Sequence, residues 1–245
     1  MTMERAIEVF VHGFSFTRSF THPYLAERLE GIWAMRDIDR TSRYYRKDEF
    51  VAYRVAAEEV DRTARAHTRG RFAVCMIRGE TDTDIDIRKG FKGLGYRLMA
   101  TEPFFVHSLG DIRTVEEPLS VVRVTTKEAA DRLSRAARTR QILPVHLAAE
   151  HPPLRQYMVS DGDVPIAWVR SIEAAGATWC SNMFVEPAYR RRGIARAMLT
   201  RMLQDDREAG SSANVLLASH TGAKLYPVLG YERIGELLMF TPPRG

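Results

Sequence analysis

The clearest hydrophobic periodicity in the chain lies between residues 193 and 208. Apolar residues recur there at three- and four-residue spacing, as on one face of a helix: Ile194, Met198, Leu199, Met202 and Leu203. The spacing predicts an amphipathic helix over Gly193–Glu208. Gly210 and the serines after it indicate where that helix ends, because glycine is a poor residue for a helix interior and a good one just past its end.

Around this helix, short apolar and β-branched runs alternate with turn signals. The runs predict strands at 119–125, 154–160, 164–172, 178–185 and 214–218, with one or two more at 231–241. Asp161-Gly162-Asp163 predicts that the second and third form a hairpin. The intervening segments predict a helix at 127–138 capped by Thr126, a shorter helical piece at 141–149, and a brief helix ending before Gly230.

The first 118 residues carry a weaker pattern. They predict helices at 43–66 and 84–93, a buried strand at 72–77 and one or two strands at 96–108. The polar stretch 111–118 ends in a proline and is the candidate linker. We therefore expect an N-terminal lobe at 1–118 and a second domain at 119–245.

Two segments share one order of elements. Residues 72–108 and 214–240 each read as a strand, a short helix, a Gly-Tyr pair and a strand. The pairs are Gly95-Tyr96 and Gly230-Tyr231. This parallel predicts a degenerate internal duplication.

Composition places the chain among globular proteins. Apolar residues make up 45% and charged residues 27% of its 245 residues. No apolar run approaches the length of a membrane span, and the N-terminus lacks the layout of a signal peptide, so we expect a cytoplasmic protein and no membrane partner. Cys75 and Cys180 sit in apolar runs and read as buried thiols rather than a disulfide. No Cys/His spacing suggests a metal site.

The chain is basic, with a net charge of +5 and a pI of about 9.3. Nucleic-acid binding is one reading of that excess. The basic residues are spread along the chain, however, and no helix-turn-helix, RNP or zinc pattern accompanies them. A small anionic ligand is an alternative source of the bias.

The only dense basic cluster has a specific context. In residues 185–195 a buried strand ends, a proline turn follows, three arginines come next, and Gly193 opens the long helix. The first N–H groups of a helix have no partner within it, and the helix dipole favours negative charge there. Because Gly193 has no Cβ, a phosphate can approach the backbone closely. The alternative reading is a solvated, arginine-rich surface turn.

This segment resembles the pyrophosphate-binding motif of the GCN5-related N-acetyltransferase (GNAT) superfamily, Arg/Gln-x-x-Gly-x-Gly/Ala, as Arg190-x-x-Gly193-x-Ala195. The resemblance implies an α/β fold with a mixed sheet, the GNAT acyl-CoA acyltransferase fold. It implies that the backbones of Met183 and Val185 bind the pantetheine arm of acetyl-CoA. It also implies pyrophosphate contacts from a run of backbone N–H groups, those of Arg191, Arg192, Gly193, Ile194 and Ala195.

A second motif supports the first. Residues 219–231, from Ser219 to Tyr231, are similar to the family's Asn-x-x-Ala-x-x-Leu-Tyr-x-x-x-Gly-Phe. Tyr226 matches the tyrosine that protonates the departing thiolate in this family, and the alternative is an ordinary core tyrosine. Ser219 and Gly222 depart from the pattern, but a serine can still bond the cofactor arm.

The resemblance implies direct transfer of the acetyl group to an amine. The N–H of Phe184 or Val185 would polarise the thioester carbonyl, and Tyr226 would be the acid. Glu173 and His220 are the candidate bases, directly or through water. The alternative for Glu173 is a solvated turn residue, and the alternative for His220 is a helix-entry residue that binds no substrate. Cys180 is a weaker candidate, as a nucleophile, because no cationic neighbour in sequence lowers its pKa.

The predicted function is that of an acetyl-CoA-dependent N-acetyltransferase acting on a small-molecule or peptide amine. The alternatives are a non-catalytic acyl-CoA sensor, transfer to a hydroxyl, or transfer of a longer acyl chain. The N-terminal lobe lacks the phosphate motif, so we expect no CoA there. Its aromatic residues could line an acceptor pocket or fill a core: Phe14, Phe16, Tyr24, Trp33, Tyr44 and Tyr45. The sequence does not decide whether the protein is a homodimer.

Overall fold

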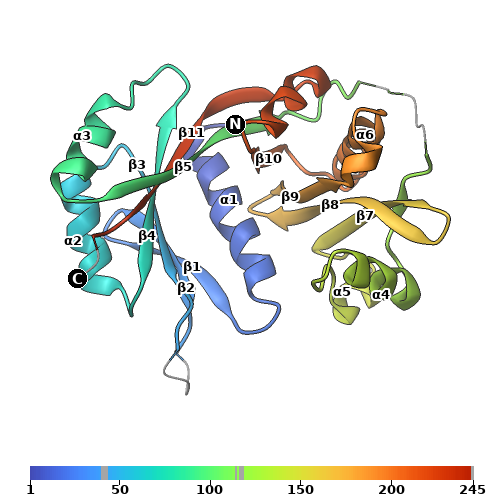
Figure 1. Ribbon diagram of the computed structural model, residues 1–245, viewed down its shortest axis with the longest axis horizontal. Helices are drawn as coiled ribbons and strands as arrows, with labels where there is room; N and C mark the ends of the chain where they lie inside the picture. The colour runs from blue at the N-terminus through green and yellow to red at the C-terminus, as the bar shows by residue number, and fades with distance from the viewer. Residues whose placement is uncertain (40–43, 114, 116–118, 244–245) are drawn as a thin grey trace. The chain divides into compact units, whose positions relative to one another are not determined.

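The computed structural model describes residues 1–39, 44–113, 115 and 119–243 (Figure 1). The chain forms two compact units that do not follow a single cut in the sequence. The N-terminal unit takes in Thr2–Phe105, Leu217–Ala223 and residues 233–243, and the C-terminal unit takes in Val106–Leu216 and Lys224–Glu232. No helix in the described ranges is long and apolar enough to cross a membrane.

The N-terminal unit is a mixed sheet with helices on both faces. Its sheet has the order β1-β2-β3-β4-β11-β5. The strands are β1 (Tyr24–Leu29), β2 (Ile32–Asp37), β3 (Asp48–Tyr53), β4 (Phe72–Gly79), β5 (Arg97–His107, shared with the other unit) and β11 (Glu232–Thr241). The helices are α1 (Met3–Arg18), α2 (Ala57–His67) and α3 (Ile85–Gly93).

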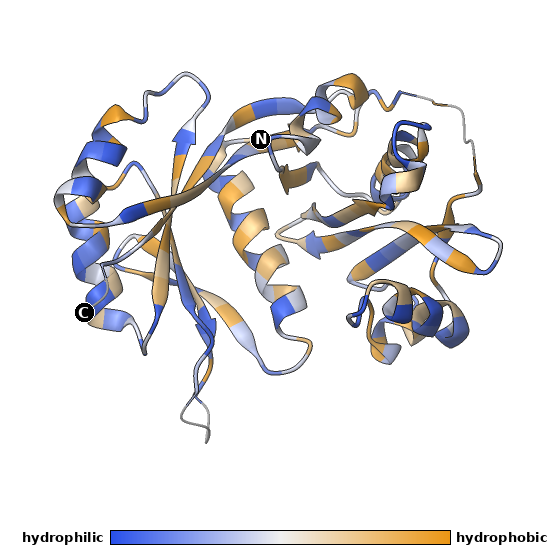
Figure 2. Cartoon of the chain, in the orientation of Figure 1, coloured by the Kyte–Doolittle hydropathy of each residue, from blue (hydrophilic) through white to orange (hydrophobic). Residues whose placement is uncertain are grey.

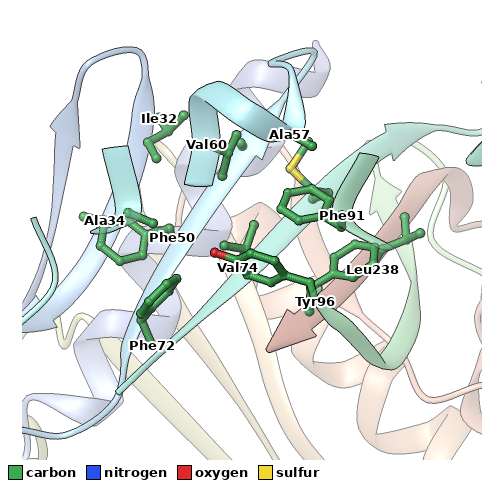
Figure 3. Packing of buried hydrophobic residues seen from close by; sticks show 14 residues of the cluster. Ile32, Ala34, Phe50, Ala57, Val60, Phe72, Val74, Phe91, Tyr96 and Leu238 are labelled. Atoms are coloured by element: carbon green, nitrogen blue, oxygen red, sulfur yellow. The ribbon is translucent and has the colours of Figure 1, made fainter. Parts of the chain in front are cut away.

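Burial on both faces explains why β3 and β4 read as continuous apolar runs. Phe50 and Val74 point to one face, where they pack with Val60 of α2 and Phe91 of α3 (Figure 3). Helix α1 packs on β1 and β2. It is largely hydrophobic (Figure 2), with buried Ile7 and Phe10.

The C-terminal unit has the strand order β10-β9-β8-β7-β6. The strands are β6 (Val122–Arg123), β7 (Leu154–Asp161), β8 (Val164–Ala174), β9 (Ala177–Val185) and β10 (Asn214–Leu217). The helical segments are α4 (Lys127–Ala136), α5 (Pro144–Ala148), η1 (Pro187–Tyr189), α6 (Ile194–Glu208) and η3 (Tyr226–Leu229), with η2 (Gly222–Lys224) at the edge of the other unit. Helix α6 contacts β7, β8 and β9, and α4 contacts β8 on the opposite side of the sheet (Figure 1).

A buried carboxylate ties α6 to this sheet. Asp206 is fully buried and pairs with Arg155 of β7 at 2.9 Å. It also accepts hydrogen bonds from Ser171 at 2.7 Å, Thr178 at 2.7 Å and Asn214 at 2.9 Å. Because these donors come from β8, β9 and β10, one side chain fixes the strands at the point where β9 and β10 begin to pair.

The two units repeat one plan. Residues 24–107 and 154–241 each form three antiparallel strands, a helix, a strand parallel to the third, a short helical segment and a last strand. The last strand of the second series, β11, belongs to the sheet of the N-terminal unit. The parallel pair begins alike in both, with Asp48 N donating to Arg71 O and Thr178 N donating to Ala213 O. The predicted Gly-Tyr parallel is also present in the backbone, because Tyr96 N and Tyr231 N each donate to the carbonyl five residues earlier.

Most predicted elements of residues 119–241 are confirmed to within a few residues at their ends, although the brief helix before Gly230 is a pair of 3-10 turns. Thr126 caps α4 as expected, accepting a hydrogen bond from Ala129 N. The predicted helix at 43–66 is wrong: β3 occupies its middle, and α2 begins only at Ala57. The mistake has a physical cause, because a strand buried on both faces shows no alternation of apolar and polar positions. The hydrophobic pattern predicted neither helix α1 nor the strands β1 and β2.

The predicted lobe boundary between residues 118 and 119 stays a prediction. The candidate linker at 111–118 is described only at 111–113 and 115, and Arg244 and Gly245 lie outside the described residues. At the chain's end, β11 pairs with β4 from Gly235 opposite Gly79 to Phe240 opposite Val74. The last strand of the predicted second domain is therefore part of the N-terminal unit's sheet.

Candidate active site

The parallel strands β9 and β10 pair at their start and then separate. Their register contains two pairs within the described residues, Asn214 with Thr178 and Val215 with Trp179. Strand β9 continues beyond these pairs to Val185. Its second half is only partly buried, although its first residues are fully buried. The separation leaves one edge of β9 free for a ligand's backbone-like groups.

A β-bulge lies where the strands part. The register of β8 with β9 runs from Arg170 opposite Ser181 to Trp168 opposite Phe184, so Val169 faces two residues of β9. Asn182 takes a left-handed φ of 54° there, a conformation that asparagine tolerates better than most residues. The bulge re-aims the rest of β9.

Backbone alternation after the bulge sets the direction of each peptide group. Glu186 N donates to Ile166 O of β8 at 2.8 Å. Successive residues of a strand point their N–H and C=O groups to opposite sides. The backbone N–H and C=O groups of Val185 and Met183 therefore point away from β8, and those of Phe184 point toward it. Of the two predicted carbonyl donors, this geometry favours Val185 over Phe184.

The turn after β9 forms a cationic concavity at the start of α6. Arg191 has φ 65° and Gly193 has φ 83°, and left-handed residues in such turns gather N–H groups into an anion nest. The backbone bond that starts the helix runs from Ala197 N to Gly193 O at 3.1 Å, so the N–H groups of Gly193 to Arg196 are not used within the helix.

The arginines surround this concavity. Arg190 Nε donates to Val185 O at 2.9 Å. Arg192 lies over the ring of Tyr189, 5.2 Å from its centroid, and the Tyr189 hydroxyl donates to Asp161. Arg190, Arg191 and Arg192 are all exposed. The predicted phosphate-binding residues, Arg190 to Ala195, are therefore brought together at one helix N-terminus.

Tyr226 lies on η3 and is almost fully buried. Its ring packs edge-on against Tyr231, with centroids 5.4 Å apart. Burial raises the pKa of its hydroxyl, and the nearby Cys180 thiol adds to the rise. The phenol therefore stays protonated at neutral pH and is available as a proton donor. Cys180, the residue that adds to this rise, is a buried free thiol. Burial also raises the pKa of the Cys180 thiol.

Two contacts hold η3 in place. His107 is buried, accepts from Leu109 N at 2.9 Å, and lies 3.0 Å from Leu229 O. Since one ring nitrogen accepts, the other donates, which fixes the neutral tautomer. Arg113 donates to Val228 O at 2.8 Å. The segment that enters the C-terminal unit thus fixes the helical turn that carries Tyr226.

Residues 153–233 match the sequence model of the acetyltransferase (GNAT) domain. Residues 153–233 are therefore identified with the GNAT domain. The prediction of this superfamily from the two motifs is confirmed. No curated protein matches the sequence.

Solved structures extend the GNAT likeness to the whole chain. A GCN5-related N-acetyltransferase from Kribbella flavida matches with a TM-score of 0.68 and 15% identity, over 98% of this chain and 96% of that one. A putative GNAT-family acetyltransferase from Novosphingobium aromaticivorans matches with a TM-score of 0.56 and 14% identity, over 97% of each chain. A tandem GNAT protein from the clavulanic acid biosynthesis pathway matches with a TM-score of 0.53 and 11% identity, over 99% and 96%. At these identities the likeness shows the fold, and the predicted mixed-sheet GNAT fold is confirmed.

The other predicted residues of the GNAT site lie elsewhere. Glu173 lies near the C-terminal end of β8, opposite Thr178 at the start of β9, and its carboxylate pairs with Arg155 at 2.7 Å. Ser219 and His220 belong to the N-terminal unit. There the Ser219 hydroxyl accepts from Gly222 N at 3.1 Å, and His220 Nε2 lies 2.7 Å from the Thr101 hydroxyl.

The N-terminal unit carries the corresponding strands in a closed form. Its parallel pair, β3 and β4, stays in register over six residue pairs, from Asp48 with Phe72 to Tyr53 with Ile77. Only residues 54–56 separate β3 from α2, which has Glu58 and Glu59 in its first turn. Acidic residues at a helix N-terminus disfavour an anion.

Sequence reasoning missed three residues of this region. Asn182 sits in an apolar run, where its left-handed backbone gave no signal. Asp206 is one of two adjacent aspartates on α6, and adjacent carboxylates are common on the solvated face of a helix. Arg170 interrupts the apolar run of β8, and a lone charge inside such a run is the signal that could have found it.

Proposed function

We propose that the C-terminal GNAT domain binds acetyl-CoA and transfers its acetyl group directly to an amine. The observation that carries this proposal is the separation of β9 from β10 beside the phosphate-binding turn of α6. A free strand edge suits the amide groups of pantetheine, and the nest with its arginines suits the pyrophosphate.

The two parts lie on one continuous stretch of chain. Val185 ends the free edge of β9, and its carbonyl holds Arg190 of the turn. A ligand whose amide groups pair with Met183 and Val185 of β9 can therefore place its anionic end at the N–H groups of residues 191–195. This arrangement fits an anionic head joined to an amide-bearing arm, which is the chemical plan of CoA.

The reaction needs four groups. The amine nitrogen attacks the thioester carbon, and the carbonyl oxygen gains negative charge, which the Val185 N–H stabilises. The C–S bond then breaks, and the thiolate takes a proton from the Tyr226 hydroxyl. The amine's surplus proton passes to a base, and Tyr226 regains its own from solvent. The products are the amide and free CoA.

Of the two candidate bases, Glu173 is the less suited to the role. Glu173 is engaged by the buried Arg155, so its carboxylate serves the β7–β8 packing. His220 is exposed, and its Nε2 lies beside the Thr101 hydroxyl, which leaves Nδ1 to accept a proton directly or through water. Burial raises the pKa of the neighbouring Glu102, and His220 offsets part of that rise.

We further propose that the N-terminal unit does not bind CoA. Its parallel strands pair throughout, and its turn before α2 is too short and too acidic for a pyrophosphate. One site per chain follows, in the C-terminal unit.

A direct test is incubation of the purified protein with acetyl-CoA and a panel of amines. Thiol release and the mass of the acetylated product are followed together. We expect both to rise above the uncatalysed rate for at least one amine, and to be lost in a Gly193→Glu variant. Arg207→Glu, at the other end of α6, is the matched control and should keep the activity. Thiol release with longer acyl-CoAs alone would instead indicate a different acyl group.

A further inference from the structure

Arg170 is a partly buried cation on the sheet of the C-terminal unit. Its Nε donates to the Ser181 hydroxyl at 3.0 Å, and its Nη1 donates to Gln141 O at 3.5 Å. Both acceptors are neutral. Across the described residues the guanidinium pairs with no carboxylate, although a charge taken even partly out of water is stabilised by a paired opposite charge.

The charge is costly in this position. Burial lowers the pKa of Arg170 to about 10, well below the usual value for arginine. Nη2 donates to neither neighbour, yet it is not among the sealed polar atoms that lack a partner in the described part of the chain. Solvent or a ligand therefore reaches it. A preformed pair of free N–H groups on a fixed guanidinium is suited to a planar oxyanion.

The position of Arg170 relates it to the proposed chemistry. It lies opposite Ser181, directly before the bulge at Asn182. Ser171, the next residue, bonds Asp206 of α6, so Arg170 points to the other face, the one that α4 contacts. Cys180 pairs with Ser171 and lies on the α6 face with Tyr226. The proposed acid for the leaving sulfur lies on that face, which leaves the face of Arg170 for the acceptor.

The surroundings of Arg170 form an ordered surface on that face. Trp168, two residues away on β8, stacks on Phe184 with ring centroids 4.3 Å apart. Asn182 donates to the side chain of the fully buried Gln141. Gln141 thereby links Arg170 to the bulge. The Trp168–Phe184 stack and the Arg170 guanidinium thus lie on either side of the β-bulge.

We propose that Arg170 binds a carboxylate of the acceptor, so that the amine acetylated by this domain belongs to a molecule that also carries a carboxylate, such as an amino acid or the C-terminal part of a short peptide. This inference rests on the proposed acetyl transfer and adds the acceptor's chemical class. The carboxylate supplies the partner that the protein itself does not give to Arg170.

The test compares matched acceptors and matched variants. Each amino acid of a panel is assayed beside its carboxamide, which keeps the amine and side chain but removes the negative charge. The proteins are the intact chain, Arg170→Met, Arg170→Lys, and Arg135→Met as a control on exposed α4. The Kd for acetyl-CoA is measured for each, because it reports on the cofactor site independently of the acceptor.

We expect the intact protein to prefer at least one free amino acid over its amide by about 100-fold in kcat/KM. Arg170→Met should abolish that preference by raising KM, with the Kd for acetyl-CoA unchanged. Arg170→Lys should keep part of it, because the charge remains and the fork is lost. Arg135→Met should behave as the intact protein.

Three results would overturn the inference. One is equal use of acids and amides by the intact protein. Another is a preference that survives in Arg170→Met. The third is the absence of turnover with every carboxylate acceptor in a protein that binds acetyl-CoA, which would leave the cofactor site standing and remove the acceptor class. A protein that binds no acetyl-CoA would refute the proposed function itself.

Discussion

Tyr226 packs edge-on against Tyr231, and Phe91 packs in the same way against Tyr96 in the other unit. In each pair the second residue follows a left-handed glycine and returns its N–H to the carbonyl of the first. The two pairs are therefore equivalent positions of a repeated plan. The N-terminal copy has a phenyl ring where the C-terminal copy has a phenol, so only one copy retains a group that could protonate a thiolate.

Removal of that phenol is the sharpest change at the site. We expect Tyr226→Phe to lower kcat by about 100-fold, because a general acid contributes roughly 10²–10⁴. The Kd for acetyl-CoA should stay the same, since the ring and its packing remain. Steady-state kinetics and titration calorimetry measure the two quantities separately. Tyr96→Phe removes a tyrosine hydroxyl in the N-terminal unit, with its bond to Asp61, and should leave kcat unchanged.

Asp206 should be a main source of stability in the C-terminal unit. Asp206→Ala leaves the buried Arg155 without this carboxylate partner. It also removes the acceptor for hydrogen-bond donors on three strands. We expect a loss of about 3–5 kcal/mol in the free energy of unfolding, as for other broken buried ion pairs. Urea denaturation followed by circular dichroism measures it. Asp131→Ala, which breaks an exposed pair with Lys127, should change little; a similar loss there would contradict the assignment.

These contacts mark the limit of what the sequence predicts. The long helix and the turn before it were predictable because the Arg190 to Ala195 spacing and the apolar periodicity are local. The Asp206 network and the bulge at Asn182 were not, because their partners lie up to 51 residues apart. Strand β3 was read as a helix because both its faces are buried, and the pairing of β11 with β4 depends on the placement of a whole strand.

Stability should fall in acid through His107. Burial lowers the pKa of this imidazole, although Leu229 and Asp111 act in the opposite direction. The unfolded chain therefore takes up the proton first as the pH drops below about 6.5. Stabilisation by neutral His107 is complete above that pH and is lost as the pH falls through the folded value. Unfolding free energies at pH 8 and pH 5.5 should differ more for the intact protein than for His107→Gln.

Substitution of the two candidate bases should affect different quantities, the melting temperature for Glu173 and kcat for His220. Glu173→Gln is expected to lower the melting temperature modestly, through the weakened pair with Arg155, with kcat retained. His220→Gln is expected to lower kcat, with the melting temperature retained. A large fall in kcat for Glu173→Gln alone would reverse the assignment.

The central claim is that the turn at the start of α6 holds the pyrophosphate of acetyl-CoA. Isothermal titration of the purified protein with acetyl-CoA tests it most directly, beside an Arg192→Glu/Gly193→Glu variant and the Arg207→Glu control. We predict micromolar binding that the double variant loses and the control keeps. Absence of binding to the intact protein at millimolar acetyl-CoA, or equal binding by the double variant, would contradict the account.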